Sequence, residues 1–187
     1  MIIIGITGTI GAGKGTIVEY LVAQYGFKHF SVRSYLQAQM QALGMPDNRD
    51  SMTLLANRLR EEHSPAYIVE QLYAQAAQQH THAVIESIRT PGEVEALRAV
   101  GGTSFYLMAV DAPQPLRYQR AYARGSSTDH ISYDTFVANE AREMQNSEPH
   151  KQNLQKCIAM ADVLLDNSKD INHLQQQIQA FVENIVS

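Results

Sequence analysis

Cysteine is almost absent from this chain of 187 residues, in which Cys157 is the single one. One thiol cannot form an intramolecular disulfide, and it cannot supply the several sulfur ligands of a zinc site. A chain without disulfides fits a reducing compartment. We therefore expect a cytoplasmic protein.

Long hydrophobic segments are also missing. No run of about 18 apolar residues occurs, and the opening Met1–Ile6 has neither a basic leader nor a cleavage signal of small residues. We expect a protein that is neither exported nor inserted in a membrane.

An excess of positive charge is absent as well. Fifteen Lys and Arg stand against 19 Asp and Glu, which gives a formal net charge of -4 and a pI near 5.9. No global basic field is available to hold nucleic-acid phosphates, so we expect no nucleic acid as the main partner. The hydrophobic content of 44 % and the charged content of 18 % are typical of one folded domain over residues 1–187.

Short apolar runs alternate with helical patterns along the chain. Each run is continuous and short, as in strands that are buried on both faces. The runs are 2–6, 27–30, 83–85, 105–110 and 163–165. Apolar residues recur at helical spacing from Ile17 to Val22 and from Ile171 to Ile185. This alternation predicts an α/β domain with a parallel sheet covered on both faces.

Two segments interrupt the alternation. Residues 34–80 contain up to three helices and no convincing strand, which is longer than an ordinary crossover. We expect them to form a helical insertion that covers a substrate. A polar stretch begins at Gly125, and we expect residues 125–146 to form a short lid.

Capping residues predict several helix boundaries. Ser64-Pro65 and Thr90-Pro91 each place a good N-cap before a proline, which predicts that helices start there. Gly44 and Gly125 follow helical patterns and are suited to the left-handed residue that ends a helix.

The most specific pattern is Gly8-Thr9-Ile10-Gly11-Ala12-Gly13-Lys14-Gly15-Thr16, between the first apolar run and a helix. Glycines let backbone N–H groups turn inward toward phosphate oxygens, the helix N-terminus adds partial positive charge, and Lys14 supplies a cation. In this context Gly-x-x-x-x-Gly-Lys predicts that residues 8–16 bind the phosphates of ATP. The alternative, a glycine-rich turn without a ligand, is disfavoured because strand, glycines, lysine and helix all occur in the required order.

A magnesium ion is expected with the ATP. The strict motif has Ser or Thr directly after the lysine, where the hydroxyl binds Mg²⁺, whereas here Gly15 precedes Thr16. We assign Thr16 and Glu86, which follows the third apolar run, to the metal. The alternative for Glu86 is a carboxylate satisfied by a nearby N–H or cation. Asp111 is a weaker candidate, because Asp111-Ala112-Pro113 also fits a plain turn.

Arginines are expected to complete the site, because phosphoryl transfer brings two anions together. Arg89 follows the third strand, at the end of the sheet where ligands collect. Arg120 and Arg124 are four residues apart and share one helix face, and Arg120 is also assigned to ATP. The alternative for this pair is a solvated basic stripe that includes Arg117. The predicted catalytic residues are Lys14, Arg89, Arg120 and Arg124.

The motifs resemble those of known kinases. The Lys-Gly-Thr ending of the loop and the segment 83–97, in which a strand, an acidic residue and an Arg-Thr pair precede a helix, are similar to adenylate kinases. Overall the chain resembles a poorly characterised group of archaeal adenylate-kinase-like nucleotide kinases, which share the Ile-Arg segment and an Arg-Gly-x-x-x-Asp lid. Residues 161–168 are similar instead to dephospho-coenzyme A kinases. These resemblances imply the five-stranded, three-layer nucleoside-monophosphate-kinase fold of the P-loop nucleoside triphosphate hydrolase type.

The resemblance also implies roles on the acceptor side. The arginine of this segment grips the acceptor phosphate in adenylate kinases, and a glutamine four residues later reads the acceptor base; Arg89 and Glu93 occupy these positions. Thr90-x-x-Glu93 is also a capping box, so Glu93 has the alternative role of satisfying the Thr90 N–H. Arg33 is assigned to the acceptor phosphate or base. Arg60–His63 fits a solvated helix face.

The residues favour an anionic acceptor. Dephospho-coenzyme A kinases carry Asp-x-Asp after the second strand to act as a base on a hydroxyl, whereas Phe30–Ser34 contains an arginine and no carboxylate. A phosphate monoester is already largely ionised near neutral pH. We therefore predict an ATP-dependent kinase acting on a (deoxy)nucleoside monophosphate. The alternatives are a dephospho-coenzyme A kinase and an NTP-hydrolysing switch protein without a small acceptor; base, sugar and oligomeric state are left open.

Overall fold

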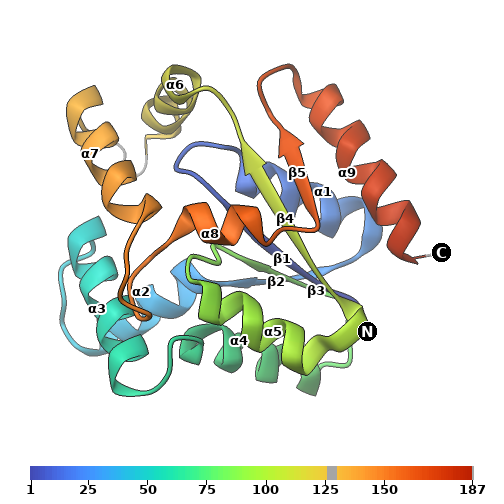
Figure 1. The fold of residues 1–187 in the computed structure, drawn as a ribbon, viewed down its shortest axis with the longest axis horizontal. Coiled ribbons are helices and arrows are strands. Elements are labelled where there is room, and N and C mark those ends of the chain that lie inside the picture. Colours follow the sequence, from blue (N-terminus) through green and yellow to red (C-terminus); the bar gives the residue numbers. More distant parts are fainter. Residues whose placement is uncertain (126–129, 187) are drawn as a thin grey trace.

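The structure is a computed structural model that describes residues 1–125 and 130–186. Its five strands form one parallel sheet in the order β2-β3-β1-β4-β5 (Figure 1). The strands are β1 (Ile3–Gly8), β2 (Lys28–Ser31), β3 (Ala83–Glu86), β4 (Phe105–Asp111) and β5 (Val163–Asp166). This confirms the predicted α/β fold with a five-stranded parallel sheet.

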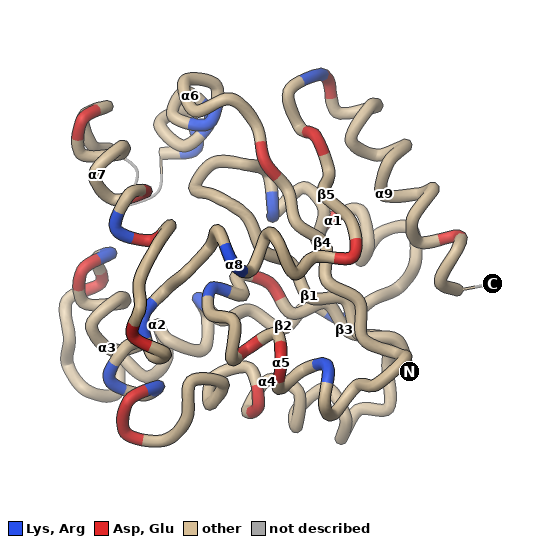
Figure 2. The backbone as a smooth tube through the Cα atoms, in the orientation of Figure 1, with Lys and Arg blue, Asp and Glu red and all other residues tan. Residues whose placement is uncertain are grey.

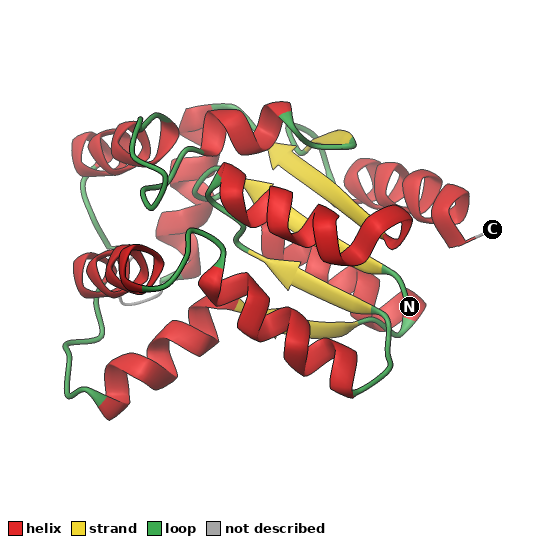
Figure 3. Ribbon diagram, turned by 60° about the horizontal axis from the view of Figure 1, so that its bottom comes forward, coloured by secondary structure: helices red, strands yellow, loops and turns green. Residues whose placement is uncertain are grey.

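Helices connect the strands and cover both faces of the sheet (Figure 3). They are α1 (Lys14–Tyr25), α2 (Val32–Ala42), α3 (Arg49–Glu62), α4 (Tyr67–Gln78), α5 (Pro91–Gly101), α6 (Gln114–Arg124), α7 (Tyr133–Met144), α8 (Leu154–Ala159) and α9 (Ile171–Val186), with a 3₁₀ turn at Gly102–Ser104. Within the described ranges, no helix is both long and apolar enough to cross a membrane.

The central strand β1 divides the hydrophobic core in two. All six of its residues are buried, because alternate side chains of a strand point to opposite faces and both faces are covered. Ile4 and Ile6 pack with residues of α1 and α9, whereas Ile3 packs with residues of α2, α4 and α5. Burial of these apolar side chains fixes the position of β1 in the sheet, and therefore the point at which the loop after β1 begins.

The predicted interruption is helical. Residues 34–80 contain most of α2 and all of α3 and α4, and no strand. Gly44 and Gly125 have φ angles of 65° and 66° after α2 and α6, and α5 begins at Pro91 with Thr90 as its cap, as predicted.

The predicted helix start at Ser64-Pro65 is wrong. The helix α4 begins at Tyr67 with Ala66 as its N-cap, because the chain first makes a turn in which the Tyr67 N–H donates to the Ser64 carbonyl at 3.1 Å. The Ser64 hydroxyl donates instead to the Glu70 carboxylate at 3.1 Å.

The carboxyl ends of all the strands lie at one edge of the sheet, since every pairing is parallel. Gly8, Glu86 and Asp111 end three adjacent strands there. Ligands of open α/β sheets collect at this edge. Along the described backbone, Lys and Arg are interspersed with Asp and Glu (Figure 2).

Candidate active site

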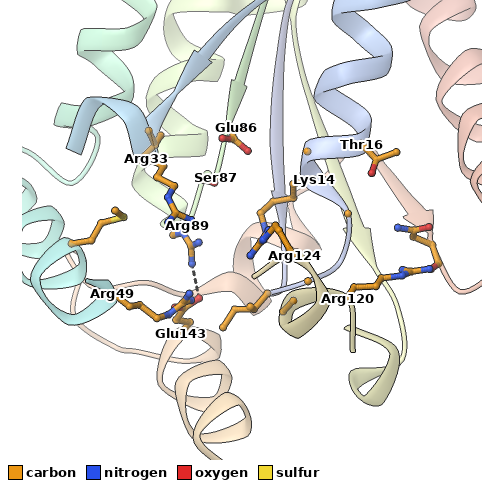
Figure 4. A pocket seen from close by; sticks show the side chains of 18 of the residues that line it. Lys14, Thr16, Arg33, Arg49, Glu86, Ser87, Arg89, Arg120, Arg124 and Glu143 are labelled. Atoms are coloured by element: carbon orange, nitrogen blue, oxygen red, sulfur yellow. Dashed lines mark hydrogen bonds and ion pairs between the residues drawn. The ribbon is translucent and has the colours of Figure 1, made fainter. Parts of the chain in front are cut away.

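A cavity of about 620 Å³ opens at the carboxyl ends of β1 and β3. Its wall contains residues from the loop after β1, from α2, α3 and α6, and from α7 (Figure 4). The predicted site residues that the structure brings together in this wall are Ile10, Gly11, Gly13, Lys14, Gly15, Thr16, Arg33, Glu86, Arg89, Arg120 and Arg124. The cavity therefore contains most of the predicted ATP residues and two of the three predicted acceptor residues, whereas Gly8, Thr9 and Ala12 do not line it.

Two glycines are required by the shape of the phosphate loop. Gly11 and Gly13 have φ angles of 75° and 107°, which L side chains rarely adopt. A Cβ at Gly11 would lie 2.2 Å from the Arg117 carbonyl oxygen, and one at Gly13 would lie 2.2 Å from the Asn167 amide nitrogen. The chain approaches its supports so closely here that only glycine fits.

The carbonyl groups of the loop are held by side-chain donors. Lys14 Nζ donates to the Gly8 and Thr9 carbonyls at 2.9 and 2.8 Å. Arg117 Nη1 donates to the Ile10 carbonyl at 3.1 Å, and Asn167 Nδ2 donates to the Ala12 carbonyl at 2.8 Å. The Ala12 N–H also donates to the Thr9 carbonyl, at 3.3 Å. These contacts fix the peptide groups of a glycine-rich turn at a helix N-terminus, and successive N–H groups in such a turn form an anion nest.

Arg117 is a supporting residue of this loop, and its interpretation as part of a solvated stripe is wrong. Its side chain is 5 % exposed, donates to the Ala112 carbonyl at 2.6 Å and forms a buried ion pair with Glu140. The carboxylate neutralises the guanidinium, which allows a charged side chain to be buried under the loop. Asp111 joins this support by accepting a hydrogen bond from the Thr9 hydroxyl at 2.7 Å.

Lys14 has an unusual protonation equilibrium. Burial, and then the positive charge of Arg89, lower the pKa of its ammonium group to about 7. Near neutral pH the group therefore exchanges readily between charged and neutral forms. An anionic ligand favours the charged form.

A second cluster of charges, around Glu143, lies in the same cavity. Arg89 Nη1 donates to Glu143 Oε2 at 2.5 Å, and Arg49 Nη2 donates to the other carboxylate oxygen (Figure 4). The Glu143 side chain is 3 % exposed. Burial opposes its ionisation, but the charges of Arg89 and Arg49 hold its pKa below the ordinary value. The two arginines thus surround an anionic carboxylate.

Local structure places these three side chains. Asn48 caps α3 by accepting from the Ser51 N–H, so Arg49 stands at the first position of that helix. The loop that carries Arg89 is tied to β1 because the Ile88 N–H donates to the Ile6 carbonyl at 3.1 Å. Glu143 lies in the last turn of α7. Neither Arg49 nor Glu143 has a sequence signal that distinguishes it from other charged helical residues.

Glu86 and Thr16 line the cavity on either side of Lys14, and their side-chain oxygens are the candidate metal ligands (Figure 4). Glu86 Oε1 accepts from the Ser31 hydroxyl at 3.2 Å and lies 3.4 Å from His29 Nε2. Burial opposes ionisation of Glu86, but His29 and then Lys14 hold its pKa below the ordinary value. In the described residues no group of three His, Cys, Asp or Glu side chains is placed to hold a metal. Mg²⁺ keeps waters and takes substrate phosphates as further ligands, so it needs few protein ligands, and carboxylate and hydroxyl oxygens are the types it prefers.

Arg120 and Arg124 both reach the cavity wall from α6. Arg120 Nη1 donates to the Asn167 carbonyl at 2.8 Å, which joins α6 to the loop after β5. Of the predicted lid over 125–146, residues 126–129 lie outside the described part of the chain. The remainder of that range contains α7.

Glu93 is not brought to the cavity. It is 0 % exposed, and it completes the capping box with Thr90. Its Oε1 accepts from Arg60 Nε and Nη2 at 3.0 and 2.6 Å, and its Oε2 accepts from the N–H of Arg89 at 2.7 Å. The interpretation of Arg60 as a solvated residue is wrong, because its side chain is 1 % exposed and paired with this buried carboxylate.

The fold and the phosphate loop define a P-loop nucleotide-binding α/β domain. A family model described as an AAA domain matches residues 4–148, more than half of the chain. The protein therefore belongs to this family of P-loop domains.

Individual proteins are similar to this chain over nearly its whole length. A UPF0200 protein of Pyrobaculum aerophilum is 28 % identical over 177 residues, which covers 94 % of each chain. The solved structure of TT1252 from Thermus thermophilus has a TM-score of 0.63 at 20 % identity and covers 98 % of this chain and 97 % of its own. A gluconokinase from Sinorhizobium meliloti has a TM-score of 0.60 at 13 % identity, with coverages of 99 % and 95 %. The fold is thus that of small P-loop kinases.

Proposed function

We propose that the protein is an ATP- and Mg²⁺-dependent kinase that transfers the γ-phosphate of ATP to a (deoxy)nucleoside monophosphate. One observation carries the proposal. Arg89 and Arg49 surround a buried carboxylate in the same cavity that contains Lys14 and the phosphate loop. A phosphate group offers the same kind of anionic oxygens to two guanidinium groups, which bind phosphate and carboxylate alike.

The charge of the cavity supports an anionic acceptor as well as an anionic donor. In the described wall, eight Lys and Arg side chains face three Glu side chains, although the whole chain has a net charge of -4. The basic residues are Lys14, Arg33, Arg49, Arg60, Arg89, Arg120, Arg124 and Lys169, and the acidic residues are Glu19, Glu86 and Glu143. Such a concentration of cations offsets the repulsion between two phosphate-bearing substrates.

The proposed reaction places ATP on residues 8–16, with Arg120 and Arg124 beside it. An oxygen of the acceptor phosphate attacks the γ-phosphorus, the new P–O bond forms, and the bond to the β–γ bridging oxygen breaks to release ADP. The attacking oxygen is already ionised, so no base has to accept a proton. Mg²⁺, held by Thr16 and Glu86, would neutralise phosphate charge. Arg33 and α7 are proposed to close the acceptor side.

An acceptor panel tests the proposal. Purified protein is incubated with ATP, Mg²⁺ and one acceptor at a time, and ADP release is compared with the rate without acceptor. The panel contains ribo- and deoxynucleoside monophosphates and dephospho-coenzyme A. We expect release that requires a monophosphate. Release that needs no acceptor would indicate an NTP hydrolase, and release only with dephospho-coenzyme A would indicate a hydroxyl acceptor; either result overturns the proposal.

A further inference from the structure

Helix α3 contains buried polar atoms that the protein itself does not satisfy. Throughout the described ranges, the buried side-chain nitrogen and oxygen atoms without a hydrogen-bond partner are Arg49 Nε, Asn57 Oδ1 and Arg60 Nη1. All three belong to α3, and Arg49 and Arg60 line the cavity. Asn57 Oδ1 is an acceptor on a residue outside the cavity wall, whereas Arg49 Nε and Arg60 Nη1 are donors on residues that line it. Because buried donors are nearly always paired in folded proteins, these two nitrogens indicate that a ligand supplies their partners.

The orientation of the Arg60 guanidinium is fixed. Its Nε and Nη2 both donate to Glu93 Oε1. The other oxygen of Glu93 is held by the backbone N–H groups of Arg89 and Thr90 at 2.7 and 3.0 Å. Glu93 therefore holds one edge of the guanidinium against the loop after β3 and leaves Nη1 as the nitrogen without a partner.

The two arginines of α3 that line the cavity differ in their electrostatic surroundings. Arg49 and Arg89 share the single carboxylate of Glu143, so that cluster keeps an excess positive charge suited to a phosphate. Arg60 has Glu93 to itself, so its pair is formally neutral. What Arg60 can offer a ligand is a directed N–H donor, which suits a neutral hydrogen-bond acceptor better than a second phosphate.

Apolar side chains lie in the same half of the cavity. Leu36 of α2 and Met52 and Ala56 of α3 line its wall, and Leu36 and Ala56 are buried. On α3, Arg49, Met52, Ala56 and Arg60 follow each other at intervals of three or four residues, which places them along one helix face. A flat apolar ring attached to a phosphate fits such a strip, with the phosphate at Arg49 and the edge of the ring at Arg60.

We infer that Arg60 selects the acceptor base, and that it favours a base with a carbonyl group at purine position 6 or pyrimidine position 4 over one with an amino group there. The inference rests on the proposed function. A guanidinium group can only donate, so it pairs with a carbonyl oxygen and is left facing another donor when an amino group takes that place. Arginine pairs with the carbonyl edge of guanine for the same reason in other settings. Guanine, hypoxanthine, uracil and thymine are therefore preferred to adenine and cytosine.

Matched nucleotide pairs test this inference. IMP and AMP differ in the group at purine position 6, and UMP and CMP differ in the group at pyrimidine position 4; in each pair only the carbonyl member has a hydrogen on the neighbouring ring nitrogen. The kcat/KM of each is measured with saturating ATP and Mg²⁺. We expect the carbonyl member of each pair to be used about tenfold better or more. Equal use, or better use of AMP or CMP, overturns the inference even when the protein is a monophosphate kinase.

Variants on α3 identify the residue responsible. Arg60→Lys keeps a cation for Glu93 but removes Nη1. We therefore expect the kcat/KM ratios of IMP to AMP and of UMP to CMP to fall toward one, while the KM for ATP stays unchanged. Arg58→Lys is the matched control, because Arg58 lies on the same helix with a side chain that is 64 % exposed. A folded Arg60→Lys protein that keeps the wild-type preference overturns the assignment to Arg60.

Two further outcomes are distinguishable. If thermal unfolding shows that Arg60→Lys does not fold, the kcat/KM ratios of the wild-type protein, IMP to AMP and UMP to CMP, decide the inference. Should no monophosphate be phosphorylated at all, the proposed function fails, and calorimetric titration of the wild-type protein with IMP and AMP decides whether the site still prefers the carbonyl. Equal affinities for these two ligands would overturn it.

Discussion

Lys14 is bonded to the carbonyl groups of its own loop, and its pKa of about 7 gives a measurable consequence. Below pH 7 the ammonium form dominates, whereas at pH 8 most molecules have a neutral amine. A bound triphosphate favours the charged form. We predict that ATP binding at pH 8 takes up nearly one proton and that affinity falls as pH rises above 7.

Calorimetry in two buffers with different ionisation enthalpies measures this uptake. With excess Mg²⁺ at pH 8, the phosphates of ATP are already deprotonated and contribute little. Lys14→Ala serves as the control and should show no uptake; we also expect it to abolish transfer while the fold is kept. Wild-type binding without proton uptake at pH 8 would contradict the pKa of Lys14.

Arg89 should affect the acceptor more than ATP. Loss of a charged hydrogen bond to a phosphate costs about 1.5–3 kcal/mol, which is roughly a tenfold to hundredfold loss. We predict that Arg89→Ala raises the acceptor KM by this factor and changes the dissociation constant of ATP by less than about threefold. Arg98→Ala is a suitable control, because Arg98 pairs with Asp162 and is outside the cavity wall. An equal loss for both substrates would mean that the role of Arg89 is misassigned.

Ser87 has a left-handed backbone conformation, with a φ angle of 67°, directly beside the cavity. For a residue with a Cβ this conformation costs about 1 kcal/mol, whereas glycine adopts it freely. We predict that Ser87→Gly raises the free energy of unfolding by about 0.5–1 kcal/mol. Denaturant unfolding measures this, and Ser87→Ala, which keeps the strain, should show no gain. A loss of stability in the glycine variant would show that the serine hydroxyl outweighs the strain.

The individual side chains of the site were predictable only where they belong to local motifs. The loop at residues 8–16 and Arg89 have recognisable neighbours in the sequence, and the structure places them together. The partners of Glu143 are 54 and 94 positions away, and Asn167 bonds to the loop across 155 positions. Contacts over such separations are set by the packing of whole helices, so no spacing rule indicates them.

At the scale of elements, α7 connects the two halves of the cavity. Glu140 and Glu143 are three residues apart and therefore share a helix face. Glu140 pairs with Arg117, which supports the phosphate loop, and Glu143 pairs with Arg49 and Arg89. A movement of α7 would thus change the surroundings of the phosphate loop and of Arg49 and Arg89 together.

The ion pairs that join Glu143 of α7 to Arg49 and Arg89 lead to a prediction for Glu143→Gln. Removing one partner of a buried ion pair costs about 3–5 kcal/mol, so we expect a marked loss of stability. Sulfate should restore thermal stability more strongly in the variant than in the wild type, because an added anion replaces the missing carboxylate between Arg49 and Arg89. Glu61→Gln, at an exposed position of α3, is the control. If sulfate has the same effect on both proteins, this cluster is not an anion site.

Elements were predictable where the hydrophobic pattern was strong. The five strands and the three helices between β2 and β3 follow from continuous apolar runs and helical spacing. The start of α4 was misplaced because a turn precedes it and Ser64 has another partner. The helix α8 has six residues, which is too short for its periodicity to be recognised.

At the scale of the whole molecule, an acidic chain encloses a basic cavity. The net charge of -4 gives no indication of the eight Lys and Arg side chains that line the cavity in the described part of the chain. These residues come from segments between positions 14 and 169, and the parallel sheet brings them to one edge. The fold class was predictable because it depends on the order of apolar runs, whereas the distribution of charge depends on the three-dimensional arrangement.

The hydrogen bonds on the carbonyls of the phosphate loop have a consequence for protein engineering. The recognisable motif spans nine consecutive residues. Arg117 and Asn167 lie outside it, yet they hold two of its carbonyl groups and so fix the orientation of its peptide groups. Grafting residues 8–16 onto another strand and helix would transfer the motif without the side chains that support it. A grafted loop that binds a triphosphate would also need donors equivalent to Arg117 and Asn167.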